Sequence, residues 1–347
     1  MMRLPNFRFV APTSVHQAAE LLAASSGDTM LVAGGTDLLP NMKRRQQAPG
    51  TLVGVRHIAE LRAISSGDGV TIGAGLTLTD VIRLRQGFGG QAREAYGALW
   101  QAAAQVATPQ LRNMGTLGGN LCLDTRCNYY DQNYEWRKAI DFCMKKDGET
   151  CWVAPSSPKC VAVSSTDTAP ALLALGASVT LVSANGTRQI ALSDMYRNDG
   201  IHYLTRQRSE ILTSVHVPRL DGWRSVYWKL RRRGAFDFPV LSVAAAAKIA
   251  KDGTVEAARI VLGAVASRPV EAPAEAIAAL VGRPLTDDLI SEVAERAAQP
   301  SRPLDNTDFT LVWRKRMTKF FVSYALKELR GDDMRARRLK VSRQELL

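Results

Sequence analysis

The sequence has few histidines and no long apolar run, and both absences restrict what the protein can be. Histidine occurs 4 times in 347 residues, so a metal centre built mainly of imidazole is a poor expectation. No stretch of about 18 uncharged apolar residues occurs, and the opening MMRLPNFRFVAPTS lacks the apolar core of a signal peptide. We therefore expect no membrane partner, no secretion and a cytoplasmic location.

The basic charge of the chain does not identify a partner by itself. Lys and Arg number 45 against 33 Asp and Glu, which gives a formal net charge of +12. Such a charge suits nucleic acid, an acidic partner or a well-solvated surface. The basic clusters at 43–45, 231–233, 314–316 and 335–340 are dispersed, without the interleaved aromatic residues that a nucleic-acid surface needs. We expect no nucleic-acid partner.

All five cysteines lie within the 39 residues from 122 to 160. In a reducing compartment disulfides are disfavoured, and an odd number leaves one thiol over, so metal ligation is the natural alternative. Because the histidines lie outside this segment, the site would consist mainly of thiolates, which suits zinc or an iron–sulfur cluster. The spacings of 5, 16, 8 and 9 residues include no CxxC pair. This spacing favours an iron–sulfur cluster and leaves zinc open.

Two double-glycine turns are each flanked by hydrogen-bonding side chains. The first, AGGTD at 33–37, follows an apolar run from Met30 that predicts a short buried strand. The second, TLGGN at 116–120, follows a helix that stops near Pro109. Glycine has no Cβ and permits positive φ, so a phosphate can approach backbone N–H groups closely. One such turn is more often only a tight turn, but two of them predict a pyrophosphate cradle.

The secondary-structure pattern changes at about residue 222. Before it, helices are expected at 14–24 and 92–107, strands at 51–55, 70–75 and 211–217, and a hairpin around Asn185-Gly186. After it, three runs with antiparallel character precede two or three helices, at about 272–283, 286–298 and 307–330. The last seventeen residues carry alternating charges, which predicts an extension that lies on a partner or in solvent.

Five motifs, taken in order, resemble the FAD-binding subunit of the molybdenum hydroxylases, the family of xanthine dehydrogenases and aerobic-type carbon monoxide dehydrogenases. They are LVAGGTDLL (31–39), LRNMGTLGGNL (111–121), TDTAPALLALGA (166–177), EILTSVHVP (210–218) and YWKLRRRGAFDFPVLSVAAA (227–246). The resemblance implies an α+β protein with a two-subdomain FAD-binding fold of the vanillyl-alcohol-oxidase type, at 1–56 and 57–218. A C-terminal domain with a three-stranded antiparallel sheet and helices would follow at 219–330, and the basic extension at 331–347.

The resemblance also implies which residues hold FAD. The first glycine turn would contact the diphosphate, the second would lie against the rest of the cofactor, and three further residues would flank the flavin. A cation at the flavin's pyrimidine edge would stabilise the anionic reduced form; the alternative for Lys229 is a strand-edge lysine that faces water. The implied residues are Leu31, Val32, Ala33, Gly34, Gly35, Thr36, Asp37, Leu38, Thr116, Leu117, Gly118, Gly119, Asn120, Asp167, Leu212 and Lys229.

The chain departs from the common family pattern by an insertion of about forty residues between GGNLC and VAVSSTD. The segment 122–161 is similar to the inserted loop of the 4-hydroxybenzoyl-CoA reductase β subunit, which carries a [4Fe-4S] cluster. By this resemblance the ligands are Cys127, Cys143, Cys151 and Cys160, and Cys122 is a free thiol or a packing residue.

The resemblance to that branch implies an electron-transfer subunit without catalytic residues of its own. Reduced ferredoxin would give electrons to the [4Fe-4S] cluster. From there the electrons would pass to FAD, then to two [2Fe-2S] clusters of a small subunit, and finally to the molybdenum cofactor of a large subunit. The reaction would be dehydroxylation of 4-hydroxybenzoyl-CoA to benzoyl-CoA in anaerobic aromatic degradation, by a dimer of heterotrimers. Two alternatives stay open: the FAD subunit of an oxidising xanthine, aldehyde or carbon monoxide dehydrogenase, and a zinc-binding interaction protein without redox activity.

Overall fold

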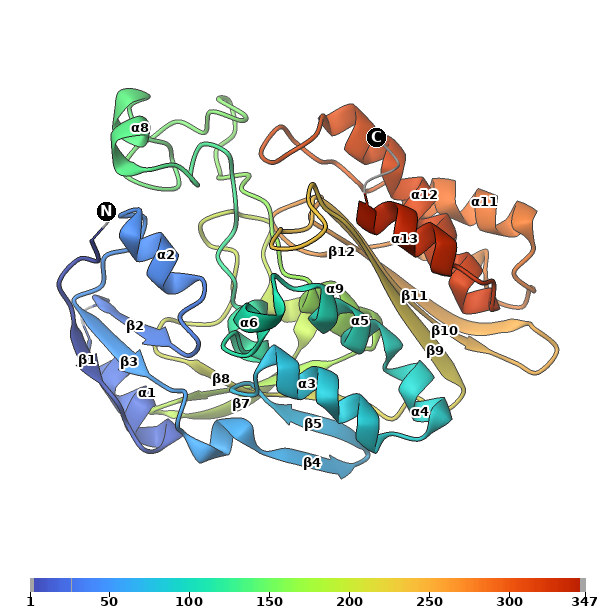
Figure 1. Ribbon diagram of the computed structural model, residues 1–347, viewed down its shortest axis with the longest axis horizontal. Coiled ribbons are helices and arrows are strands. Elements are labelled where there is room, and N and C mark those ends of the chain that lie inside the picture. The colour runs from blue at the N-terminus through green and yellow to red at the C-terminus, as the bar shows by residue number, and fades with distance from the viewer. Residues whose placement is uncertain (1–2, 26, 344–347) are drawn as a thin grey trace.

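The computed structural model describes residues 3–25 and 27–343, and within them the chain forms three β-sheets in sequence order (Figure 1). The first sheet is parallel, with the order β1-β3-β2. Its strands are β1 (Arg8–Val10), β2 (Thr29–Val32) and β3 (Thr51–Gly54), and α1 (Val15–Ala23) and α2 (Leu38–Lys43) lie in the connections. The Ser14 side chain caps α1, which the sequence predicted, by accepting a hydrogen bond from the Gln17 N–H.

The second sheet is antiparallel, with the order β4-β5-β8-β6-β7. The strands are β4 (Ile64–Gly67), β5 (Gly69–Gly73), β6 (Ser178–Ser183), β7 (Gly186–Ala191) and β8 (Ile211–Val217). The predicted hairpin is confirmed, because Ser183 pairs with Gly186 across its turn. The helices of this region are α3 (Leu78–Leu84), α4 (Gly90–Ala95), α5 (Gly97–Gln105), α6 (Pro109–Arg112), α7 (Leu117–Leu121) and α9 (Thr168–Ala174), with short 3₁₀ turns at η1 (Ala59–Arg62), η2 (Arg85–Gly87) and η3 (Leu192–Met195).

The single helix predicted at 92–107 is wrong, because the chain breaks into α4 and α5 at Tyr96 and Gly97. The break lies where a strand of the third sheet approaches the helix. A Cβ on Gly97 would overlap the backbone oxygen of Ser225, and the Ser225 hydroxyl accepts a hydrogen bond from the Ala98 N–H at 2.9 Å. The break therefore results from a tertiary contact, which the helical periodicity of the sequence does not predict.

The cysteine-bearing insertion leaves the second region after α7 and returns before α9. Its neck is a two-residue antiparallel bridge, in which Arg126 and Val163 exchange both backbone hydrogen bonds at 2.8 and 2.7 Å. The segment contains the short helix α8 (Tyr134–Ala139) and is drawn in green above α2 in Figure 1. Because the segment has little regular structure, its side chains must supply most of what holds it together.

The third sheet is antiparallel, with the order β12-β11-β10-β9, and it forms the C-terminal region with four helices. The strands are β9 (Trp223–Leu230), β10 (Leu241–Ile249), β11 (Val255–Gly263) and β12 (Val270–Glu271); the helices are α10 (Ala274–Ala278), α11 (Asp287–Ala297), α12 (Leu311–Arg330) and α13 (Arg335–Arg343). The prediction of a three-stranded sheet is wrong, because β12 adds a fourth strand. Its two residues are too few to give a sequence pattern. One face of the sheet packs on α11 and α12, and the other packs on α5 and α9 of the preceding region.

The extension at 331–347 also differs from its prediction where the structure describes it. Residues up to 343 form α13, and Val341 is buried against the C-terminal core. Arg338 donates to Glu328 at 2.7 Å and lies over the Trp228 ring, with its guanidinium carbon 4.2 Å from the ring centroid. Arg338 of the extension therefore pairs within the chain. Residues 344–347 lie outside the described residues. No helix in the described part is long and apolar enough to cross a membrane.

Candidate functional site

The two glycine turns, 84 residues apart in the sequence from Gly34 to Gly118, lie against each other in the structure. A Cβ on Gly34 would overlap the backbone oxygen of Met114, which stands just before the second turn. The second turn is held in place by a bridge between Thr116 and Thr77. The backbone contact at Gly34 thus brings the predicted diphosphate residues and the second turn into one site.

The strand that leads into the first turn differs from its prediction in its burial. Met30 to Ala33 was expected to be a buried strand, but every residue from 29 to 39 is half-buried. The reason is that β2 is an edge strand, because β3 lies between it and β1. An apolar edge strand that leads into a glycine turn suits a ligand with both an apolar part and a phosphate part.

The surroundings that a Cβ would meet differ between the glycines of the two turns. Gly35 has a φ of +69°, and a Cβ there would lie 2.9 Å from a methyl group of Leu39, so the protein itself requires the small residue. Gly119 has an ordinary φ, and its Cβ would meet only the Thr116 hydroxyl at 3.0 Å. The space over Gly119 is otherwise open, as a cofactor cradle requires.

Asn120 links the second turn to the segment that contains Asp167. Its side-chain oxygen accepts hydrogen bonds from the Thr166 hydroxyl at 2.9 Å, the Thr168 hydroxyl at 2.6 Å and the Thr168 N–H at 3.0 Å. These bonds fix the start of α9 beside the glycine turn. The role of Asn120 seen here is therefore to position Asp167, and its predicted contact with FAD stays a prediction.

Asp167 and Lys229 form a buried ion pair at 3.0 Å, with side chains 3% and 0% exposed. The alternative that Lys229 faces water is wrong. The Lys229 ammonium also donates to the backbone oxygens of Gln105 at 3.0 Å and Asp237 at 2.9 Å, so its three N–H donors are all used. Any effect of Lys229 on a flavin is therefore electrostatic or through Asp167, because no N–H is left to donate.

The same burial shifts the proton affinities of the pair. Burial raises the pKa of Asp167 and lowers the pKa of Lys229, and the attraction between the two opposes both shifts. Tyr227 donates its hydroxyl hydrogen to the second Asp167 oxygen at 2.6 Å. Leu212, the remaining predicted flavin contact, is buried on β8 in the core of this region.

Four of the five cysteines line one small cavity in the insertion. Cys127, Cys143, Cys151 and Cys160 are each less than a tenth exposed, although they are spread over 34 residues. The cavity is completed by Tyr129, Tyr130, Met144, Lys145, Trp152, Val153 and Ala162. The thiols thus converge from four separate parts of a segment that otherwise has little regular structure.

Burial changes the proton affinity of two of these thiols. Burial, with a smaller contribution from the neighbouring thiols, raises the pKa of Cys127 to about 12 and that of Cys160 to about 11. Without a metal they are neutral and unreactive at neutral pH. Among the described residues no three His, Cys, Asp or Glu side chains meet closely enough to hold a single ion. In a [4Fe-4S] cluster each thiolate binds a different iron, so the four sulfurs need not meet at one point.

Cys122 stands apart from the other four cysteines. It is partly buried against the core of the FAD-binding region and does not line the cavity. Burial raises the pKa of its thiol, and a hydrogen bond from Arg206 opposes the shift. Its expected role, as a free thiol or a packing residue, stays a prediction.

Sequence reasoning missed the side chains that fix the insertion to α2. Arg126 pairs with Asp37 of the first glycine turn and donates to Asn41 and Asp131, each at 3.1 Å. Arg137 of α8 is fully buried and donates to the backbone oxygens of residues 44 and 45. In the sequence these arginines look like surface charges, and only the three-dimensional contact reveals their role.

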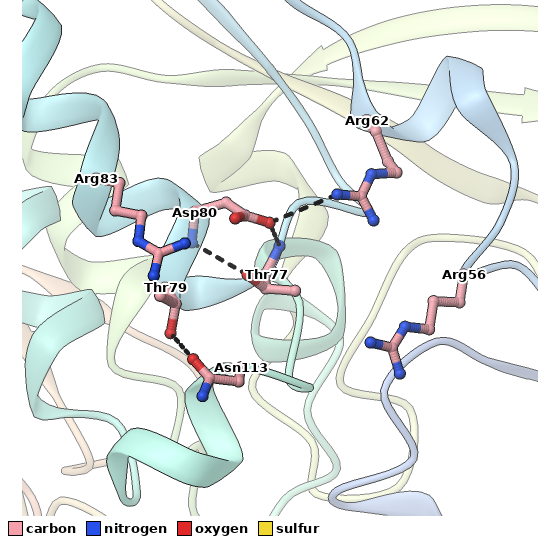
Figure 2. Close-up of a pocket in the computed structure, with 7 residues that line it drawn as sticks. All are labelled: Arg56, Arg62, Thr77, Thr79, Asp80, Arg83 and Asn113. Atoms are coloured by element: carbon pink, nitrogen blue, oxygen red, sulfur yellow. Dashed lines mark hydrogen bonds and ion pairs between the residues drawn. The ribbon is translucent and has the colours of Figure 1, made fainter.

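A basic hollow of about 310 Å³ lies beside the glycine turns. In Figure 2, Arg56 and Arg62 approach it from one side and Arg83 from the other, with Asp80 and Thr77 between them. Thr77 and Asp80 form the capping box of α3. The hollow borders the predicted FAD residues, because Arg56 contacts the sulfur of Met114, which stands just before the second glycine turn.

Together, the parallel and antiparallel sheets, the paired glycine turns and the C-terminal sheet define a two-domain flavin-binding class of protein. Residues 5–220 match the family model described as "FAD binding domain in molybdopterin dehydrogenase", and residues 225–329 match "CO dehydrogenase flavoprotein C-terminal domain". The chain belongs to the family of FAD-binding subunits of molybdenum hydroxylases.

Similar proteins agree with this family. The chain is 26% identical over 331 residues to the glyceraldehyde dehydrogenase medium chain of Sulfolobus acidocaldarius, covering 94% of this chain and 99% of that protein. It is 33% identical over 260 residues to the aldehyde oxidoreductase FAD-binding subunit PaoB of Escherichia coli, covering 72% and 79%. A chain of carbon monoxide dehydrogenase from Hydrogenophaga pseudoflava superposes with a TM-score of 0.75 at 26% identity, covering 94% and 98%. The chain is thus similar to subunits of oxidoreductase complexes over most of its length.

Proposed function

We propose that the chain is the electron-transferring medium subunit of a molybdenum-dependent oxidoreductase and that it carries a [4Fe-4S] cluster in addition to FAD. The observation that carries the proposal is the convergence of four buried thiols beside a glycine-turn FAD site. The subunit would hold no catalytic residue for the substrate. Its task would be to hold two redox groups in fixed positions.

The residues of the chain divide that task between them. FAD, when bound, supplies the exchange of electron pairs for single electrons. The first turn (Leu31, Val32, Ala33, Gly34, Gly35, Thr36, Asp37, Leu38) and the second (Thr116, Leu117, Gly118, Gly119, Asn120) would hold it. Asp167 and Lys229 would fix the charge on one side of the flavin, and Leu212 would support it from β8. The division of the chain at residues 56, 218 and 330 is part of this proposal.

The insertion would hold the cluster through Cys127, Cys143, Cys151 and Cys160. The cavity supports this assignment because it contains four thiols and is walled by aromatic and apolar side chains. Thiolate sulfur is the preferred ligand of iron in such clusters. The contact of Arg126 with Asp37 joins the neck of the insertion to the first glycine turn, which supports a short path between the two redox groups. Electrons would therefore pass between cluster and flavin within one chain.

The comparisons favour an oxidising enzyme. The relatives named above are an aldehyde-type dehydrogenase, an aldehyde oxidoreductase and a carbon monoxide dehydrogenase. We therefore propose an oxidising molybdenum hydroxylase as the main reading. Reduction of 4-hydroxybenzoyl-CoA to benzoyl-CoA, with ferredoxin as donor, is the second candidate, and the four-thiol insertion is what favours it.

The partners follow from the same family membership. A large subunit with the molybdenum cofactor and a small subunit with two [2Fe-2S] clusters would complete the electron path. A dimer of such heterotrimers, working in the cytoplasm, is the proposed assembly. Copurification with a tagged chain from its own cells would test these partners, and a chain that copurifies alone would contradict them.

Cofactor analysis of the purified full chain tests the proposal most directly. We expect one FAD per chain, about four iron and four sulfide, and a broad absorption near about 400 nm beneath the flavin bands. A yellow protein with flavin but without iron would support the FAD subunit and contradict the proposed cluster. A colourless protein that contains zinc would contradict both. Turnover of the complex with aldehydes and a dye acceptor, against 4-hydroxybenzoyl-CoA and a reduced dye, would decide the direction.

A further inference from the structure

We propose that Lys145 is a positioning residue for the four-thiol cavity: its buried ammonium group joins three of the four cysteine-bearing segments and places a positive charge beside them. This inference deepens the proposed cluster function and rests on it. It concerns a residue that neither the glycine turns nor the cysteine spacing indicates.

The ammonium group of Lys145 is fully used inside the protein. Its nitrogen lies 2.8 Å from a carboxylate oxygen of Asp124, 2.7 Å from the Thr125 hydroxyl and 2.6 Å from the Gly200 backbone oxygen. An ammonium has three N–H donors, so each has an acceptor. The side chain is 6% exposed, and Lys145 lines the cavity together with the four cysteines.

Each of these three contacts leads to a cysteine. Asp124 and Thr125 stand directly before the neck and Cys127, and Lys145 itself is two residues after Cys143. Gly200 packs against Cys160: its N–H donates to the Cys160 backbone oxygen at 2.8 Å, and a Cβ on it would lie 2.6 Å from the Cys160 sulfur. One ammonium group therefore fixes the segments that carry Cys127, Cys143 and Cys160 relative to one another.

The charge of Lys145 lies where a thiolate cluster needs it. Four thiolates around iron carry net negative charge, and burying that charge without compensation is costly. Lys145 lies over the rings of Tyr130 and Tyr203, with its nitrogen 4.8 and 5.5 Å from their centroids. Tyr130 donates to the second oxygen of Asp124 at 2.8 Å, which draws part of that carboxylate's charge away from the ammonium.

The neighbouring lysine provides a matched control. Lys146 carries the same charge one residue further on, but its side chain is 37% exposed, and among the described residues its one ion-pair partner is the adjacent Asp147 at 3.0 Å. Surface pairs of this kind contribute little to stability. Any effect of Lys145→Met that Lys146→Met does not share belongs to the buried position.

The experiment uses the full chain with Lys145→Met, Lys145→Arg, Lys146→Met and Thr125→Val. In iron-free protein, alkylation by iodoacetamide is followed for each cysteine by mass spectrometry, with Cys122 as internal reference. The same proteins are then reconstituted with ferrous iron and sulfide, and the cluster potential is titrated. FAD content checks that each variant is folded.

For Lys145→Met we expect Cys127, Cys143 and Cys160 to react about tenfold faster and the cluster to assemble about tenfold more slowly, as is usual for the loss of a residue that orients metal ligands. The potential should fall by the equivalent of about tenfold in the reduction equilibrium, which is about 59 mV for one electron. Lys145→Arg keeps the charge and should restore the potential, and Lys146→Met should match the wild type. Thr125→Val removes one acceptor and should slow assembly less.

Equal alkylation, assembly and potential in Lys145→Met and Lys146→Met would overturn the inference. If Lys145→Met does not fold, Thr125→Val decides, and wild-type behaviour in that variant would count against the positioning role. A wild-type chain that assembles no cluster would refute the proposed function instead, so the two failures are distinguishable.

Discussion

At the scale of single residues, the flavin site contains one glycine that tests ligand contact cleanly and others that do not. Gly34 and Gly35 touch the protein's own backbone or side chains, so a larger residue there would disturb the fold whether or not a cofactor binds. Gly119 faces open space apart from one hydroxyl. The sequence indicated both turns, but it could not tell these cases apart, because the difference depends on what lies opposite each Cβ.

We predict that Gly119→Val loses most of its FAD while the chain stays folded. The added side chain would project into the space over the second turn, where backbone N–H groups must be approached closely. Flavin released by heat denaturation, measured per chain, gives the result, and the far-ultraviolet circular dichroism gives the fold. Gly67→Val on the exposed strand β4, with nothing near its Cβ, is the control. Full flavin content in Gly119→Val would remove the second turn from the site.

Lys229 allows a prediction with two separate readouts. Lys229→Ala leaves Asp167 buried without its cation, which should cost about 3–5 kcal/mol of stability. Losing this positive charge should also lower the potential of bound FAD, because the anionic reduced flavin is less stabilised. Chemical denaturation and flavin potentiometry measure the two effects. The double variant Lys229→Met with Asp167→Asn should recover much of the stability; an unchanged potential in both would make the pair purely structural.

At the scale of elements, the sequence predicted what periodicity and turns encode and missed what distant contacts impose. The hairpin at Asn185-Gly186 and the helix α1 depend on neighbouring residues, and both are present. The break at Gly97 depends on Ser225, over a hundred residues away, and no local pattern contains it. The insertion shows the same limit: its cysteines were visible, but its arrangement depends on Lys145, Arg126 and Arg137.

The cysteines of the insertion carry an element-scale prediction. Replacing Cys127, Cys143, Cys151 or Cys160 singly with Ser should reduce iron and bleach the cluster absorption while FAD stays. Cys122→Ser should keep about four iron per chain, because four thiolates complete the ligand set. Iron analysis and visible spectra of the five variants measure this. Loss of the cluster in Cys122→Ser, with its retention in Cys127→Ser, would mean that the ligands are assigned wrongly by one position.

At the scale of the whole molecule, the last helix fastens the two large regions together. Arg338 on α13 donates to Gln101 of α5 at 3.0 Å and to the backbone oxygen of Tyr227 on β9, besides its contacts with Glu328 and Trp228. The predicted extension is thus an internal tie. Its low apolar content concealed this, because its contacts are made by charge and by a guanidinium on an aromatic ring.

We predict that Arg338→Ala destabilises the protein by about 1–2 kcal/mol, since it removes a bidentate carboxylate pair and a stacked guanidinium. Differential scanning calorimetry should show a lower transition temperature, with FAD content unchanged. Arg335→Ala, whose side chain is 91% exposed, should leave the transition where it is. An unchanged transition temperature in Arg338→Ala, together with weaker assembly into a complex, would contradict the internal role of α13 and support a contact with a partner.

The neck of the insertion has a consequence for how such proteins diversify. Because Arg126 and Val163 exchange both backbone hydrogen bonds, the chain enters and leaves the cysteine-bearing segment at nearly the same place. A segment with such adjacent ends can be gained or lost in evolution as a module, since neither the order of strands in the sheets nor the glycine turns has to change. A flavin subunit can therefore acquire a cysteine-bearing segment of this kind in one genetic step and refine its anchoring arginines afterwards.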